Sequence, residues 1–259
     1  WVIASASAVR LIRVMSGGSD FDILFDPSSK LMMRAEGPWI SGAGSAAEVK
    51  KAGIRVGHPV VYADCTEEIG RHTLLGRAID NRIGGYIIAQ VLASLAAAKG
   101  RPAATVIGVN AVQEEIGGHG ARMVSHRLMP NVAIVLDVTH ATDTPGVDHK
   151  KHGEVKLGGG PTLTHGSSNH PEVVKRLMSV ADKAKIPLQH ESSSRFTGTD
   201  TDVIFNQKEG IPSALVSLPL RYMHSVVEMC DLRDVDQTIK LLHSFIHSVK
   251  LNDSFRVVL

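Results

Sequence analysis

Residues 104–138 read ATVIGVNAVQEEIGGHGARMVSHRLMPNVAIVLDV, and this stretch decides the fold. Its first part, 104–112, is rich in β-branched residues and predicts a strand, whereas 120–128 has the apolar spacing of a helix. The run 132–138 predicts a second, buried strand. A strand, a helix and a strand in succession are typical of α/β layering.

The same alternation continues on both sides of this stretch. Helical periodicity is predicted upstream for residues 81–98. Downstream we expect helices at 171–185, 202–209 and 232–250, and strands at 187–190 and 213–218. The predicted fold class is therefore α/β, with a mixed central sheet flanked by helices.

Residues 1–77 have a different sequence pattern, with short apolar runs separated by glycine and proline. We expect strands at 9–14, 21–25, 31–33 and 59–62, and one helix from Ser45 to Ala52 that stops at Gly53. The sequence therefore predicts a small β-rich module at 1–77 and a larger domain at 78–259. Because the first residue is Trp1, we expect the natural N-terminus to lie further upstream.

Composition excludes several classes of protein. With 43% hydrophobic and 21% charged residues among 259, the chain can bury a core and is not of the disordered type. Its net charge of +2 does not indicate nucleic acid or an anionic membrane as the main partner. Cys65 and Cys230 form neither a disulfide framework nor metal-binding knuckles, which favours a reducing cytoplasm. The apolar run 86–98 is shorter than the roughly 20 residues of a membrane helix.

Five side chains at strand ends or element junctions could carry chemistry: Asp80, Glu114, Glu115, Asp137 and His224. Each has an ordinary alternative. Asp80 could cap a helix, and the two glutamates could lie in a solvated turn. Asp137 could pair with a buried arginine, and a single histidine is commonly a plain structural residue.

Together, however, these residues are more specific than any one of them. Three carboxylates and an imidazole supply oxygen and nitrogen ligands for two zinc-like ions, with one carboxylate to bridge them. The remaining carboxylate could then handle protons.

Four ordered motifs carry a family resemblance: AIDNR at 78–82, VQEEIG at 112–117, LDVT at 136–139 with DTPG at 143–146, and RYMHS at 221–225. GTD at 198–200 and GIP at 210–212 also match. Over residues 54–242 the chain resembles the M42 family of dinuclear metallo-aminopeptidases.

The resemblance implies roles for the five residues. Asp80 would bridge two divalent ions, zinc or cobalt, while Glu115 and His224 complete one site and Asp137 holds the other. Glu114 would be the general base. It also implies a zinc-peptidase-like fold with an inserted β-rich module and a cis peptide bond after Asp80. Peptide substrates and a homo-oligomer, in particular a tetrahedral dodecamer, are expected as well.

One part of the family pattern is missing. The family has a histidine, two residues before an aspartate, that ligates the same ion as Asp137, and no such pair precedes Asp80 here. His58 and His72 do not fit the spacing. We expect the segment with this histidine to lie outside the sequence given. The alternative is an enzyme with only one complete metal site.

Two other functions stay open at this stage. A descendant that lost catalysis could serve as a scaffold or peptide-binding protein, and the same framework could hydrolyse another amide or a glycan. Among the remaining features, GGGP at 158–161 lacks the lysine of a phosphate loop and predicts a turn. Asp200 and Asp202 could line a substrate pocket or simply begin a helix.

Overall fold

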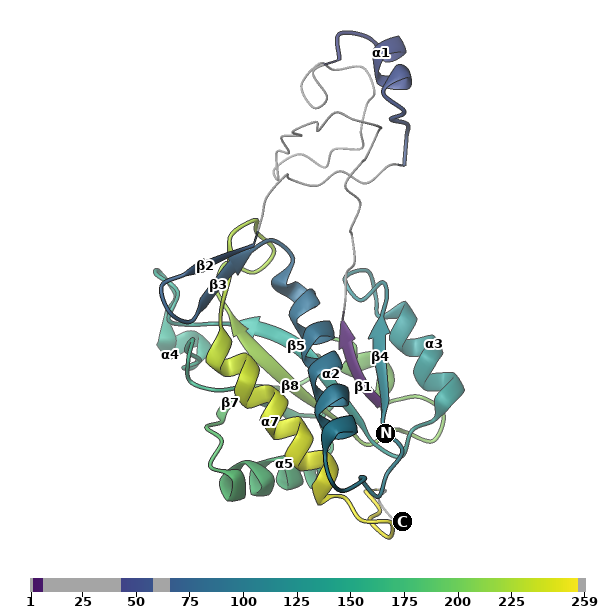
Figure 1. Cartoon of the computed structure of the whole chain (residues 1–259), viewed down its shortest axis with the longest axis vertical. Helices are drawn as coiled ribbons and strands as arrows, with labels where there is room; N and C mark the ends of the chain where they lie inside the picture. Colours follow the sequence, from purple (N-terminus) through teal and green to yellow (C-terminus); the bar gives the residue numbers. More distant parts are fainter. Residues whose placement is uncertain (1, 7–42, 58–65, 256–259) are drawn as a thin grey trace. The chain divides into compact units, whose positions relative to one another are not determined.

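The computed structural model describes residues 2–6, 43–57 and 66–255 (Figure 1). The chain divides into two compact units. The larger comprises Trp1–Ala8 and Thr66–Leu259, and the smaller comprises Val9–Cys65. The smaller unit is thus shorter than the predicted module at 1–77, because three strands of that range pair with strands of the larger unit.

In the smaller unit the described residues contain the expected helix, α1 (Ala46–Lys51). The Ser45 side chain caps it by accepting a hydrogen bond from the Glu48 backbone N–H at 3.3 Å. The helix ends at Lys51, and Gly53 two residues later has a left-handed φ of 77°. The strands expected at 9–14, 21–25, 31–33 and 59–62 lie outside the described residues.

The larger unit is built on a six-stranded sheet with the order β4-β1-β5-β8-β6-β7. β1, β4, β5 and β8 run parallel, whereas β6 is antiparallel to β8 and parallel to β7. The predicted mixed sheet is therefore confirmed. The strands are β1 (Val2–Ala6), β4 (Ile107–Ala111), β5 (Ala133–His140), β6 (Thr162–Gly166), β7 (Gln189–Ser193) and β8 (Ser213–Leu220).

Helices cover both faces of this sheet and enclose two apolar cores. One core joins the sheet to α2 (Ile79–Ala97), α5 (Pro171–Ala184) and α7 (Leu232–Ser248), which lie together in Figure 1. The other joins it to α3 (His119–Leu128) and α6 (Thr201–Ile204). All eight residues of β8 are buried, as expected for a central strand covered on both faces.

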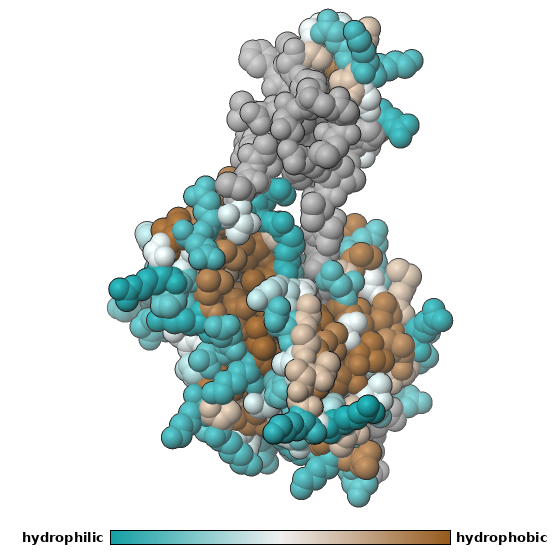
Figure 2. All heavy atoms as spheres, viewed as in Figure 1, coloured by the Kyte–Doolittle hydropathy of each residue, from teal (hydrophilic) through white to brown (hydrophobic). Residues whose placement is uncertain are grey.

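A second sheet of three antiparallel strands consists of β2 (Glu67–Ile69), β3 (Thr73–Gly76) and β9 (Glu228–Asp231). A short helix, α4 (His149–His152), completes the described elements. No helix within the described residues is long and apolar enough to cross a membrane. Figure 2 shows apolar residues at the surface on both sides of α2, bordered by charged ones.

Some expected boundaries were wrong for local reasons. The helix predicted at 202–209 ends after Ile204, and the chain then turns through Lys208, whose φ is 47°. The strand predicted at 187–190 begins later, at Gln189. The short strands β1, β2, β3, β6 and β9 were not predicted from the sequence.

Candidate active site

Parallel strands bring the candidate residues to one edge of the main sheet. β1 and β4 end side by side, with Ala6 opposite Ala111, and Ser5 lies opposite Leu136 of β5. Asp137 therefore lies level with the ends of both strands. Glu114 and Glu115 follow β4, and His224 follows β8. The carboxyl edge of a parallel sheet is where open α/β folds bind ligands.

Three of the candidates form a compact group. The His224 Nε2 atom lies 3.1 Å from Asp80 Oδ2 and 3.5 Å from Glu115 Oε2. One ligand atom from each residue lies within 4.8 Å of the others. An imidazole nitrogen and two carboxylate oxygens are a donor set that suits zinc. This group therefore fits a divalent ion.

Asp80 does not cap its helix, because the N-cap of α2 is Ala78 and no side chain caps it. Asp80 itself has a non-helical ψ of 109°. The peptide bond between Asp80 and Asn81 is cis, as expected. Burial, together with the neighbouring charges of Glu115 and Glu228, raises the pKa of Asp80 to about 6.

Asp137 lies beside this group but is not part of it. The Asn81 side-chain amide donates to Asp137 Oδ1 at 3.2 Å and to the Leu136 carbonyl at 2.9 Å. The structure records no arginine paired with Asp137 within the described residues. Burial raises the pKa of Asp137 well above its ordinary value, with added repulsion from Asp80 and Glu114. A nearby cation would offset that repulsion.

Glu114 lies in a tight turn between β4 and α3, where the Gly117 backbone N–H donates to the Glu114 carbonyl at 2.9 Å. Burial raises the pKa of this side chain to about 8, and the charges of Asp200, Glu115 and Asp80 add to the shift. A carboxyl group whose pKa is near neutrality can both take up and release a proton. This chemistry is what the sequence assigned to Glu114, although its role remains a prediction.

Glu228, which the sequence analysis missed, connects two of the candidate ligands. This side chain is 2% exposed, and its Oε2 accepts from the Asp80 backbone N–H at 3.1 Å. Its Oε1 accepts from the His224 backbone N–H at 2.9 Å. One carboxylate thus fixes the backbone on both sides of the group. No local pattern in the sequence marked this glutamate, because the four-residue strand that contains it was not predicted.

A bidentate ion pair supports the loop that carries His224. Arg221 Nε and a terminal guanidinium nitrogen donate to the two Asp143 oxygens at 3.0 and 2.7 Å. Within this loop Tyr222 and His224 have positive φ angles of 57° and 63°. The His224 side chain itself is 63% exposed, so a ligand can reach it from solvent.

Asp200 and Asp202 turn out to have different surroundings. Asp202 organises a loop by accepting from the Thr197 and Gly198 backbone N–H groups and from the Ser168 hydroxyl. Asp200 is fully buried, and neither of its carboxylate oxygens has a hydrogen-bond partner. Burial raises the pKa of Asp200 to about 6. Among the neighbouring charges, that of Asp200 contributes most to the raised pKa of Glu114.

The histidine of the family pattern is expected to lie outside the sequence given. Within the sequence, the strand β1 lies next to β5, which carries Asp137. β1 pairs with both β4 and β5, and the sequence at its end is Ser5-Ala6-Ser7. Residues 2–8 of the sequence include no histidine. Within the described residues, the group that could hold an ion contains Asp80, Glu115 and His224 and does not include Asp137.

A family model described as M42 glutamyl aminopeptidase matches residues 39–241. The lysyl aminopeptidase of Pyrococcus furiosus is 37% identical over 212 residues, which are 82% of this chain and 59% of that protein. The structure resembles aminopeptidase APDkam598 from Desulfurococcus kamchatkensis, with a TM-score of 0.75, 36% identity and coverage of 82% and 59%. It also resembles a TET aminopeptidase from a marine sediment Thaumarchaeota archaeon, with a TM-score of 0.77, 32% identity and coverage of 82% and 60%. The chain thus spans about 59% of the length of the Pyrococcus protein.

Proposed function

Since the chain belongs to the M42 peptidase family, we infer that it is the catalytic part of a metal-dependent aminopeptidase that removes N-terminal residues from peptides. The observation that carries this proposal is the group formed by Asp80, Glu115 and His224 at the edge of the sheet, with Glu114 next to it. An edge at which several carboxylates lie close together suits bound cations.

Two divalent ions, zinc or cobalt, are proposed to bind with unequal ligand sets. Glu115 and His224 would hold one ion, Asp137 would hold the other, and Asp80 would bridge them. When bound, such ions polarise a carbonyl group and lower the pKa of water. The second set is the weaker one, because Asp80 and Asp137 are both carboxylates and the set contains no imidazole.

The protein's own groups would move the proton. Glu114 would take a proton from the attacking water and return it to the leaving amine, which requires a carboxyl group near the ions but not bound to them. The amino group of a peptide N-terminus would dock against the remaining carboxylates. This placement would restrict cleavage to the first residue.

The test compares metal-stripped and zinc-reloaded protein on a panel of aminoacyl anilides. Glu114→Gln should abolish turnover while the metal content, measured by elemental analysis, stays within error of the unmutated protein. Glu172→Gln, an exposed substitution on α5, is the matched control and should be fully active. Loss of metal from Glu114→Gln would assign this residue to ligation instead.

The same panel addresses the alternative functions. A scaffold or peptide-binding protein would bind zinc or peptides but release no product from any anilide. A hydrolase of another amide or of a glycan would be inactive on anilides and active on those substrates. The scaffold is favoured by the small number of ligands at the ion that Asp137 would hold. Metal content and turnover must therefore be measured on the same sample, so that a protein that binds metal without catalysis can be recognised.

The homo-oligomer, with a tetrahedral dodecamer as its specific form, is proposed on the family resemblance. Light scattering after size-exclusion chromatography would measure the mass of the assembly, and a monomer would contradict this proposal. A cytoplasmic location is proposed from the cysteine pattern, and fractionation of cells would test it.

A further inference from the structure

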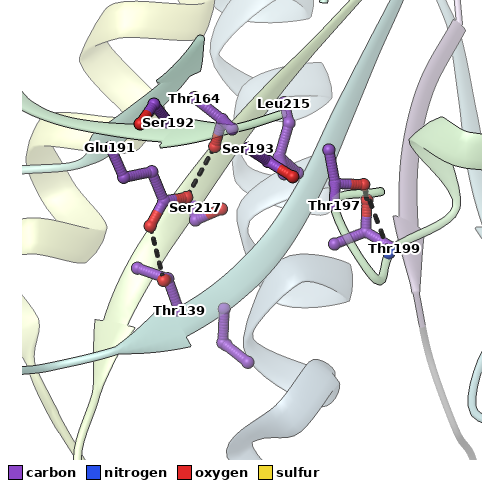
Figure 3. A pocket seen from close by; sticks show the side chains of 10 residues that line it. Thr139, Thr164, Glu191, Ser192, Ser193, Thr197, Thr199, Leu215 and Ser217 are labelled. Atoms are coloured by element: carbon purple, nitrogen blue, oxygen red, sulfur yellow. Dashed lines mark hydrogen bonds between the residues drawn. The ribbon is translucent and has the colours of Figure 1, made fainter. Parts of the chain in front are cut away.

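A polar cavity of about 190 Å³ opens beside the candidate site. Its walls come from β5, β6, β7 and β8 and from the loop after β7 (Figure 3). The residues that matter here are Thr139, Thr164, Glu191, Thr197, Thr199 and Ser217. Since a water molecule occupies about 30 Å³ in the liquid, the cavity has room for a side chain of several heavy atoms.

The strand register relates the cavity to the candidate site. Ser217 of β8 is the register partner of Asp137, so the two residues lie on neighbouring strands at the same level. Thr139 follows Asp137 by two residues in β5 and therefore points to the same face. Thr164 pairs with Glu191 across β6 and β7. A substrate residue held at the candidate ligands thus has this cavity next to it.

Glu191 gives the cavity its charge. Its Oε2 accepts from the Thr139 hydroxyl at 2.7 Å and its Oε1 accepts from the Thr164 hydroxyl at 2.5 Å, as Figure 3 shows. The two hydroxyls orient the carboxylate but do not neutralise it. Among the residues that the structure describes, no lysine, arginine or histidine lines the cavity. An ionised carboxylate has about four acceptor positions, so two remain for a ligand.

A second group in the cavity also lacks a partner. Ser217 is 1% exposed, and its hydroxyl makes no hydrogen bond in the structure. A buried hydroxyl without a partner is uncommon and indicates a group that something else satisfies. One negative charge, several hydroxyls and an unpaired serine together suit a ligand that carries hydrogen-bond donors and a positive charge.

We propose that this cavity receives the side chain of the substrate's first residue and that Glu191 makes the protein select lysine and arginine there. The proposal rests on the proposed aminopeptidase function and adds its substrate class. An acidic first residue would meet the Glu191 charge and be repelled. A large apolar one would bury that carboxylate without a counter-charge.

The experiment compares kcat/KM for lysyl, arginyl, norleucyl and glutamyl anilides with zinc-loaded protein. Norleucine has the aliphatic chain of lysine without its ammonium group, so the lysine-to-norleucine ratio measures the charge. We expect lysine and arginine to be the preferred substrates. Glu191→Gln should lower kcat/KM for both by about 10- to 100-fold, the usual range for a hydrogen bond to a charged group. The norleucine value should stay within about threefold, since that side chain makes no charged contact.

One further variant and a control separate the effect of the Glu191 charge from that of its side-chain shape. Glu191→Asp keeps the charge and should keep the preference for basic residues, while the Glu172→Gln control should match the unmutated protein. If Glu191 only tied the strands together, Glu191→Gln would change all substrates by the same factor. A preference for glutamyl or norleucyl anilide in the unmutated protein, or an unchanged lysine-to-norleucine ratio in Glu191→Gln, would overturn the proposal.

A binding measurement keeps this result distinct from a failure of the aminopeptidase function. If no anilide is cleaved, calorimetry with lysinamide and norleucinamide tests the cavity alone. Tighter binding of lysinamide that disappears in Glu191→Gln would support the cavity's selectivity without any turnover. Equal binding of the two amides would contradict it.

Discussion

Glu228 fixes the backbone amides of Asp80 and His224 with its two carboxylate oxygens. A glutamine at this position has only one acceptor oxygen, so one of the two amides would lose its partner. Groups that orient metal ligands commonly contribute 10- to 100-fold to metal affinity.

We therefore expect Glu228→Gln to bind zinc about 10- to 100-fold more weakly than the unmutated protein. Competition with a fluorescent chelator would measure the affinity, and circular dichroism would verify that the fold persists. Glu172→Gln again serves as the control. Unchanged affinity would mean that the ligands are held by other contacts.

Asp234 gives a prediction for stability at the residue scale. Fully buried at the start of α7, it accepts from the Gly158 and Gly160 backbone N–H groups, each at 2.7 Å. Burial nevertheless raises its pKa to about 6, from 3.8. The folded state therefore holds more protons than the unfolded state between pH 4 and 6, and this carboxyl group makes the protein less stable as the pH rises through that window.

The expected loss between pH 4 and 6 is up to about 3 kcal/mol for this one group. Urea unfolding of the unmutated protein and of Asp234→Asn at several pH values would measure it. The asparagine variant should be less stable near pH 4, where it has lost one acceptor, and its stability should fall less as the pH rises. Parallel curves for the two proteins would contradict the raised pKa.

The residues that the sequence identified share a visible signal. Asp80, Glu115 and His224 are polar side chains directly beside apolar runs, and such positions converge in α/β folds. Glu228 and Glu191 lie within short, partly polar strands that gave no periodic pattern. Each has one partner more than 50 residues away, Asp80 for Glu228 and Thr139 for Glu191, and no local pattern contains such a partner.

At the scale of elements, the turn at Gly158-Gly159-Gly160 anchors the start of β6 against α7. It is a turn, as predicted, and its amides bind Asp234. Gly160 has a φ of +92°, and a Cβ atom there would lie 2.3 Å from the Pro187 carbonyl oxygen. Gly146 has a similar φ of +87°, but a Cβ atom there would meet nothing within 4 Å.

These two glycines make a matched pair. Gly146→Ala should cost about 1 kcal/mol from the left-handed backbone alone. Gly160→Ala should cost at least about 2 kcal/mol more, because the Pro187 backbone must also move. Thermal unfolding should place the two midpoints several degrees apart. Equal midpoints would show that the turn can shift freely.

Elements with strong periodicity were predicted well, and those without it were not. α2, α5 and α7 and the buried strands β5 and β8 follow their apolar patterns. β6 and β7 are short and alternate with polar residues, and these two strands form half of the proposed specificity cavity. The region of the cavity was therefore the least predictable part of the sheet.

At the scale of the whole molecule, residues 2–6 belong to the larger unit although the next residues of that unit begin at Thr66. The sequence favoured a simple division at residue 77, because local patterns cannot reveal pairing with strands more than 100 residues away. β1 lies between β4 and β5, so both of its hydrogen-bonding edges are used.

Removal of residues 1–6 should therefore unfold the larger unit. It would leave the facing edges of β4 and β5 unpaired within the sheet, a loss that exceeds the roughly 5 to 15 kcal/mol by which domains are stable. Far-UV circular dichroism and urea titration would measure the effect. A truncated chain with an unchanged unfolding midpoint would show that β1 is dispensable.

The position of β1 also bears on how the protein is made. Val2 pairs with Ile107 and with Ala133, so more than 100 residues separate this strand from either of its partners in the sequence. Such distant pairing slows folding and prolongs the exposure of a bare strand edge. Newly synthesised chains should consequently depend on chaperones that shield β1 until its partner strands β4 and β5 have been made.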